Sequence, residues 1–243
     1  VTPLQLSSQN SAPTSMWIPY IVTIFFYITI LGSSSLLLSS ITTEKQNRIL
    51  EVLLSSLTPL ELLTGKIIAL GAAGLLQTLV WAGSGITLLR LAGRQLNLGA
   101  GFAIPPEFLM WSALFFILGY ALYGSLMAGL GAMAPNLRKA TQSTLLIIFP
   151  LIIPMMFSTS VAATPNAPAF LLMSLFPLTS PIMMLSRISA ASIPLWQILV
   201  SLGLLACACV FVVRSVSRLF RAQVLLSGNP FKARAFFRAL FSR

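Results

Sequence analysis

Five long stretches of this chain contain no Asp, Glu, Lys or Arg, and they restrict its fold more than any other feature. They cover residues 1–43, 67–89, 108–137, 140–186 and 188–213. Each is longer than the roughly 20 residues that cross a bilayer as a helix. Only 8% of the chain is charged, too little to cover so many apolar runs in water. We therefore expect an all-α integral membrane protein.

The lengths of these runs and the charges that flank them predict a bundle of about five transmembrane helices. The predicted spans are 17–41, 65–89, 108–134, 141–161 and 195–213. Small residues recur at helical spacing in the third span, with Gly124, Ala128 and Ala132 on one line. Such a face lets helices approach closely, so it indicates packing within or between protomers.

The 15 Lys and Arg residues are distributed unevenly among the connections. If the first loop is cytoplasmic, that side holds 12 of them and the other side three, one of which is Arg187. Because cytoplasmic loops carry the excess of Lys and Arg, we expect a multi-pass protein of the cell (inner) membrane with its carboxy terminus in the cytoplasm. Trp17, Trp111 and Trp196 would then lie at the outer ends of spans, where amphipathic rings prefer to sit.

This orientation divides the chain into three parts. Residues 1–16 are expected to end an extracellular region, 17–218 to form the transmembrane domain, and 219–243 to form a basic cytoplasmic tail. We expect the tail to rest on anionic lipid, with partner binding as the alternative. The chain begins with Val1 and shows no signal peptide, so we expect a further helix upstream in the natural protein.

Prolines interrupt the region around the fourth span. Pro150 and Pro154 each remove a helix hydrogen bond, which argues against a straight helix. Beyond them, 170–176 and 182–188 are apolar but too short to cross a membrane. We interpret them as re-entrant helices packed on the outer side of the protein, with a simple apolar loop as the alternative.

The loop after the first span predicts an amphipathic helix at 43–55. Glu44, Arg48 and Glu51 would stack opposite charges along one face, three and four residues apart. Ile49, Leu50, Leu53 and Leu54 make the other face apolar. Such a helix lies along the cytoplasmic membrane surface, although a charged face that is merely solvated is the alternative.

A second helix should begin directly afterwards. Thr58 supplies a capping hydroxyl, Pro59 suits the first helical position, and Glu61 stands three residues after the cap. The helix then continues through Gly65 and Lys66 into the second span, where the lysine can extend to the membrane interface.

The segment EKQNRILEVLLSSLTPLELLTGK, residues 44–66, resembles a motif of permease subunits of type-2 ATP-binding-cassette (ABC) exporters. The similarity is strongest to the sodium-extrusion, NatB-like group, and the tail RLFRAQVLLSGNPFKARAFFRALF is similar to the ending of that group. Members of the family carry six spans, so this chain resembles their carboxy-terminal part.

The resemblance implies that the amphipathic helix is a coupling helix that docks on a separate ABC ATPase subunit. Glu44, Lys45, Arg48 and Glu51 are then the candidate contacts. It also implies a homodimer or pseudo-dimer of permeases, with ATP and Mg on the partner subunit and no cofactor on this chain.

Catalytic motifs are missing from the chain itself. Gly65 and Lys66 are followed by Ile67 and lack the preceding glycine of a phosphate-binding loop. The sequence has no His and no Asp, and none of its predicted spans contains a Glu. We therefore expect a transporter permease and not an enzyme, without a metal site or nucleic-acid partner.

The sequence thus favours the transmembrane subunit of an ABC exporter. A secondary carrier is the first alternative, although such carriers usually keep ionisable residues inside the membrane. A membrane scaffold protein is the second. Sodium is suggested as substrate by the family similarity alone. Ser33, Ser34 and Ser35 could supply oxygen ligands, with hydrogen bonds to their own helix backbone as the equal alternative. Lipophilic drugs and other small molecules remain alternatives.

Overall fold

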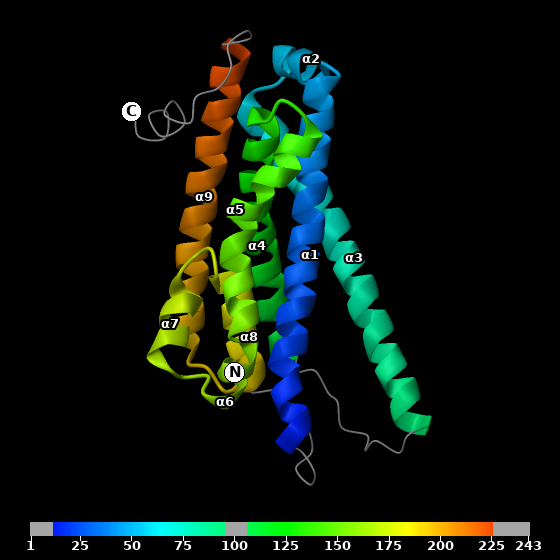
Figure 1. Cartoon of the computed structure of the whole chain (residues 1–243), viewed down its shortest axis with the longest axis vertical. Coiled ribbons are helices and arrows are strands. Elements are labelled where there is room, and N and C mark those ends of the chain that lie inside the picture. Colours follow the sequence, from blue (N-terminus) through cyan, green and yellow to red (C-terminus); the bar gives the residue numbers. More distant parts are fainter. Residues whose placement is uncertain (1–11, 96–105, 226–243) are drawn as a thin grey trace.

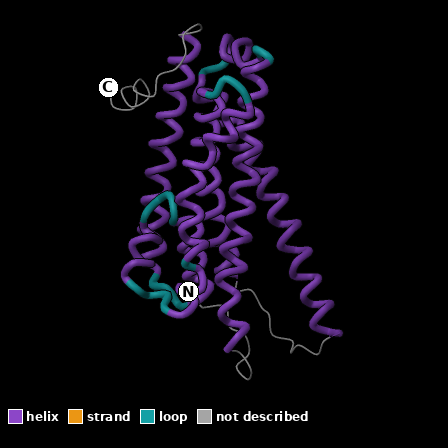
Figure 2. The backbone as a smooth tube through the Cα atoms, viewed as in Figure 1, coloured by secondary structure: helices purple, strands orange, loops and turns teal. Residues whose placement is uncertain are grey.

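The computed structural model describes residues 12–95 and 106–225, and every regular element within them is a helix (Figures 1 and 2). The long helices are α1 (Ala12–Gln46), α3 (Pro59–Gln95), α4 (Pro106–Met133), α5 (Leu137–Met156) and α9 (Leu195–Leu225). The short helices are α2 (Ile49–Ser56), α6 (Ser158–Ala163), α7 (Pro168–Leu175) and α8 (Ser180–Ala190). Residues 1–11 and 226–243, which hold most of the predicted extracellular end and tail, lie outside the described residues.

Five segments are long and apolar enough to cross a membrane, which confirms the predicted all-helical bundle. They are Pro19–Gln46, Pro59–Gly85, Pro106–Met133, Leu137–Ala163 and Leu195–Phe220. The first and last extend beyond the predicted spans at their carboxyl ends, because no helix breaker follows the last apolar residues there.

Helix α4 lies at the centre of the bundle. In its most apolar stretch of 18 residues 61% of the residues are buried, against 44% or less in the corresponding stretches of the other spans. Its small residues let the neighbouring helices come close, as the sequence predicted. A Cβ atom at Gly124 would lie 3.2 Å from Leu37 of α1, and one at Gly129 would lie 3.1 Å from Val216 of α9. These close contacts hold α1 and α9 on two sides of α4.

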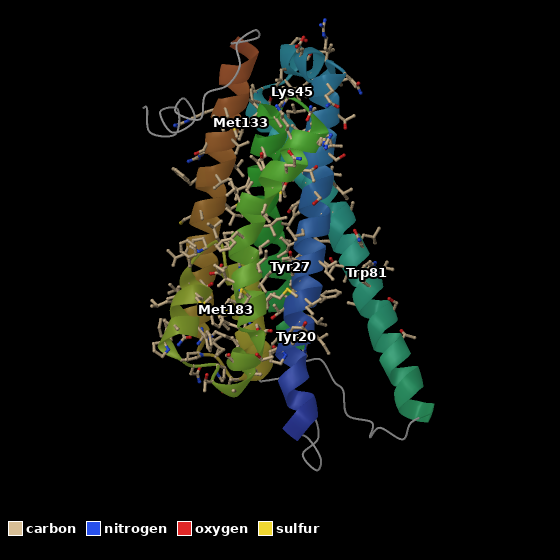
Figure 3. All side chains as sticks on the ribbon, viewed as in Figure 1. Tyr20, Tyr27, Lys45, Trp81, Met133 and Met183 are labelled. Atoms are coloured by element: carbon tan, nitrogen blue, oxygen red, sulfur yellow. The ribbon has the colours of Figure 1, made fainter. Side chains whose placement is uncertain are left out.

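Helix α3 approaches the bundle through glycines near its middle and then diverges from it (Figure 1). A Cβ atom at Gly71 would lie 2.8 Å from the ring of Tyr120, and one at Gly74 would lie 2.4 Å from the hydroxyl of Ser33. Beyond this contact α3 stands apart, with Trp81 on its outlying part (Figure 3). Only 11% of the residues in its most apolar stretch of 18 are buried, so most of its surface is left for lipid or another helix.

Helix α5 contains both of the prolines that the sequence analysis singled out. Pro150 and Pro154 lie inside the helix, which ends at Met156, and Phe157 separates it from the short α6. Transmembrane helices tolerate proline when neighbouring groups satisfy the freed carbonyl groups, and Pro154 is buried against other helices.

The two predicted re-entrant segments form α7 and α8, at the end of the bundle opposite α2 (Figure 1). Neither is long enough to cross a membrane. Helix α8 is enclosed by protein, since every residue from Ser180 to Ser189 is buried. A Cβ atom at Gly119 of α4 would lie 2.7 Å from the Pro181 side chain, so α8 sits directly against the central helix.

Candidate docking site

One end of the bundle carries an exposed short helix between two spans. α1 ends at Gln46, Asn47 and Arg48 form a turn, α2 follows, and α3 begins at Pro59. Arg48 has a φ of 58°, a left-handed conformation that ends helices and turns the chain sharply. This turn divides the helix predicted at 43–55, because Thr43, Glu44, Lys45 and Gln46 continue α1. Opposite charges therefore do not stack along one continuous helix.

Helix α2 packs on the bundle through its leucines. Leu50 is buried, and Leu53 and Leu54 pack beside it against a cluster that includes Leu62 and Leu63 of α3. Because α2 has only two turns, this contact must hold it in place, as so short a helix is marginal alone. Three residues of the predicted apolar face thus pack on the bundle, against a cluster with residues from α1, α3, α4 and α9, whereas the fourth, Ile49, is exposed.

The other side of α2 is exposed, and we call it the α2 surface. It consists of Arg48, Ile49, Glu51, Val52 and Leu57. Val52 is 69% exposed, Ile49 45% and Leu57 43%. An exposed apolar patch flanked by one positive and one negative side chain is typical of a protein contact.

Two of the four predicted contact residues point into the protein. Glu44 pairs with Lys66 of α3, and Ser40 joins them, accepting from the Lys66 ammonium at 2.9 Å and donating to Glu44 at 3.0 Å. The Lys45 ammonium donates to the carbonyl groups of Ala132 and Ala134, at the carboxyl end of α4. Glu44 and Lys45 therefore connect α1 to α3 and α4, whereas Arg48 and Glu51 remain exposed.

The start of α3 is fixed by a reciprocal cap. The Thr58 amide donates to the Glu61 carboxylate at 2.8 Å, and the Glu61 amide donates to the Thr58 hydroxyl at 3.3 Å. Pro59 occupies the first helical position. Gly65 is exposed, with open space where a Cβ atom would lie, and the Lys66 ammonium pairs with Glu44. The α2 surface is thus held between two firmly anchored helix ends.

Basic residues gather at this same end. The connection from α1 to α3, the turn between α4 and α5 and the carboxyl end of α9 all lie there (Figure 1). These elements carry Lys45, Arg48, Lys66, Arg138, Lys139, Arg214 and Arg218. The sequence grouped these residues on one side of the membrane, and the fold places them at one end.

At the opposite end, Arg187 has a structural role that the sequence analysis did not assign to it. The sequence placed it on the outer side of the membrane without assigning it a partner, and in the structure it is fully buried. Its guanidinium donates to the carbonyl group of Pro165 at 2.8 Å, to Ser174 Oγ at 2.7 Å and to Gln197 Oε1 at 2.9 Å. Burial lowers the pKa of Arg187 from its usual value, yet an arginine remains charged in proteins.

Arg187 therefore joins α7, α8, α9 and the loop before α7. The signal was present in the sequence, since Arg187 is the single charged residue between 140 and 213. A charge in so apolar a region must find polar partners inside the protein.

Other predicted features do not form a site. Ser33 lies against α3 and Ser34 is buried, but Ser35 is on the exposed side of α1, so the three serines do not converge. Among the described residues, no three His, Cys, Asp or Glu residues group as metal ligands would. Trp111 is buried in the core, whereas Trp196 is 56% exposed at the start of α9.

The five long apolar helices define a multi-pass membrane protein, and the α2 surface is exposed at one end of it. Residues 1–214 match the model of the ABC-2 family transporter proteins. The chain therefore belongs to the ABC-2 family of transporter proteins.

Two curated relatives are similar over most of this chain. The uncharacterized protein YhaP of Bacillus subtilis is 26% identical over 96% of the chain. The uncharacterized protein MJ1024 of Methanocaldococcus jannaschii is 29% identical over 87% of it. These alignments cover 57% and 51% of the two relatives, so the chain spans about half of their length. No solved structure matches the chain.

Proposed function

We propose that this chain is the transmembrane subunit of an ABC exporter, with α2 as the coupling helix that docks on a separate ATPase subunit. The exposed α2 surface, held rigidly between α1 and α3, is the observation that carries the proposal. A contact that must transmit force needs this arrangement, because a mobile loop would absorb the displacement. The family membership supplies the type of partner.

The proposed orientation places α2 in the cytoplasm. The basic residues at the α2 end support this, since Lys and Arg are in excess on cytoplasmic loops. The α7 and α8 end would then face outward, and the carboxy terminus would be cytoplasmic. ATP and Mg would bind the ATPase subunit alone, where hydrolysis drives transport out of the cell.

We further propose that two permease halves assemble with two ATPase subunits and enclose the substrate path between them. The sparsely buried α3 and α5 leave apolar surface that a second membrane half could cover. The similarity to the NatB-like group suggests sodium, with lipophilic drugs and other small molecules as further candidates. Uptake of radioactive sodium or a lipophilic dye into inverted vesicles containing both subunits would identify the substrate class.

Charge variants on the α2 surface test the docking site. Arg48→Glu and Glu51→Lys should weaken binding of the ATP-hydrolysing subunit that purifies with the wild-type chain, and should reduce ATP-dependent transport. Arg48→Asn removes the charge but keeps a residue that tolerates positive φ, so it separates charge from backbone geometry. Arg138→Glu, an exposed reversal on the neighbouring turn, is the matched control.

The expected pattern is weakened assembly in both α2 variants, with normal folding in detergent and an unaffected control. Normal assembly and normal ATP-dependent transport in both variants would exclude α2 as the docking helix. Transport that persists without any ATPase subunit would instead favour a secondary carrier.

A further inference from the structure

The carboxyl end of α4 depends on a residue from another helix. The last carbonyl groups of a helix have no partner within it, and basic side chains often satisfy them. α4 has no basic residue in its last turn, and Pro135 follows directly after Ala134. Lys45 of α1 supplies the missing cation by donating to the carbonyl groups of Ala132 and Ala134.

The position of Lys45 connects this cap to the α2 surface. Lys45 lies in the last turn of α1, two residues before the turn at Asn47 and Arg48 that leads into α2. Figure 3 shows Lys45 and Met133, the last residue of α4, at the same end of the bundle as α2. A movement of α2 must therefore act on the residues next to Lys45.

Close packing prevents the ends of α1 and α4 from moving independently. A Cβ atom at Gly131 would lie 2.9 Å from the Thr42 hydroxyl and 3.0 Å from the carbonyl group of Leu38. Thr42 is fully buried and donates to Leu38, so its side chain has no room to retreat. The Lys45 contact lies next to this tight crossing.

From there α4 leads to the opposite end of the molecule. The Tyr123 hydroxyl donates to the carbonyl group of Leu178, in the segment between α7 and α8. Gly119 packs directly against Pro181 at the start of α8. One continuous helix thus contacts Lys45, beside the α2 turn, at its carboxyl end and the α7–α8 segment nearer its middle.

We propose that Lys45 is a positioning residue that transmits displacement of α2 into α4. This inference rests on the proposed function, because it requires a partner that displaces α2. It differs from the role expected from the sequence, in which Lys45 contacts the ATPase directly. Lys45 instead acts inside the membrane subunit, through the α4 carbonyl groups, and α4 carries the movement toward α7 and α8.

Hydrogen exchange on the permease in lipid nanodiscs can separate docking from transmission. Protection of 49–56 after addition of the ATPase subunit reports docking, and a nucleotide-dependent change at 130–134 reports transmission. Lys45→Met should keep the docking signal and reduce the change at 130–134 about fivefold or more, the size of a typical coupling between sites. Lys45→Arg keeps the cation and should show the full change at 130–134. Lys139→Met removes an exposed lysine nearby and should alter neither the docking signal nor the change at 130–134.

The cap itself is tested without the ATPase. In the isolated permease, Lys45→Met should speed exchange at 132–134 about three- to tenfold, because the last turn of α4 loses its capping cation. Unchanged exchange there would overturn the structural basis of the proposal.

The other possible results of the hydrogen-exchange experiment also decide for or against the role of Lys45. Loss of the docking signal in Lys45→Met would show that Lys45 is a docking contact and overturn the proposal. A normal change at 130–134 in that variant would do the same. If the wild-type chain shows no docking signal, the proposed function fails and the transmission role fails with it, whereas docking without a change at 130–134 refutes transmission alone.

Discussion

Replacing Arg187 by methionine should destabilise the end of the bundle formed by α7 and α8. Methionine keeps much of the side-chain length but removes every hydrogen-bond donor. Ser174 Oγ, Gln197 Oε1 and the carbonyl group of Pro165 would then lose the guanidinium while they remain inside the protein. Ser174 is fully buried and Gln197 is 8% exposed, so water cannot easily replace the lost partner.

The size of the effect follows from these three bonds. Hydrogen bonds between buried groups of membrane proteins contribute about 0.6 kcal/mol on average and up to about 1.7 kcal/mol, so three of them amount to about 2–5 kcal/mol. Removing a buried charge also removes its desolvation cost, which offsets part of the loss. We expect a net loss of about 2–3 kcal/mol, or a fall of about 4–12 °C in Tm for a chain of this length.

Thermal unfolding of the purified permease in detergent measures this loss. Arg138→Met, an exposed arginine at the other end, should change stability by less than about 0.5 kcal/mol. Arg187→Lys keeps the charge but has a single nitrogen in place of three, so it should recover only part of the stability. The double variant Arg187→Met with Gln197→Leu should lose less than the sum of the single changes, because both partners of one bond are removed together.

The reasoning is refuted if Arg187→Met unfolds at the wild-type temperature. Full recovery by Arg187→Lys would also contradict it, because the charge alone would then account for the stability. Strictly additive effects of the two single changes would show that the Arg187–Gln197 hydrogen bond contributes nothing.

Three further predictions concern the helix ends and one close contact. Arg48→Gly should stabilise the turn before α2 by up to about 1 kcal/mol, because glycine adopts a positive φ without strain, and denaturant unfolding would show the gain. Thr58→Ala should cost about 1 kcal/mol and speed hydrogen exchange of the Glu61 amide, because the reciprocal cap of α3 is lost. Gly119→Val should cost about 1–3 kcal/mol by forcing α4 away from Pro181, whereas Gly85→Val, at a glycine with open space where a Cβ atom would lie, should lack this effect in the same unfolding assay.

The sequence alone was sufficient to predict the membrane spans and the start of α3. A span needs only a long run without charges, since the thickness of the hydrocarbon layer sets its length. The cap at Thr58 and Glu61 depends on residues three apart, so local spacing contains all the information it requires. The grouping of basic residues was also readable from their order along the chain.

The directions of individual side chains could not be predicted in this way. Lys45 and Glu44 lie in a segment that looked like one exposed amphipathic helix, but their partners come from α4 and α3. Lys45 and Ala132 are 87 residues apart, so only the packing of α1 on α4 brings them together. The prolines of α5 likewise remain in a helix because the surrounding bundle supports it.

Arg187 shows most clearly which properties the sequence determines and which depend on the tertiary structure. Its charge and apolar surroundings are properties of the chain, and they already require a polar environment. Which oxygens provide that environment depends on how α7, α8 and α9 meet, because the three acceptors lie 10 to 22 residues away on separate elements. The hydropathy of a segment is a sum over residues that are neighbours in the sequence, so it can be obtained without knowing the fold. A hydrogen bond between distant residues needs two atoms within about 3 Å of each other, and only tertiary packing brings them together.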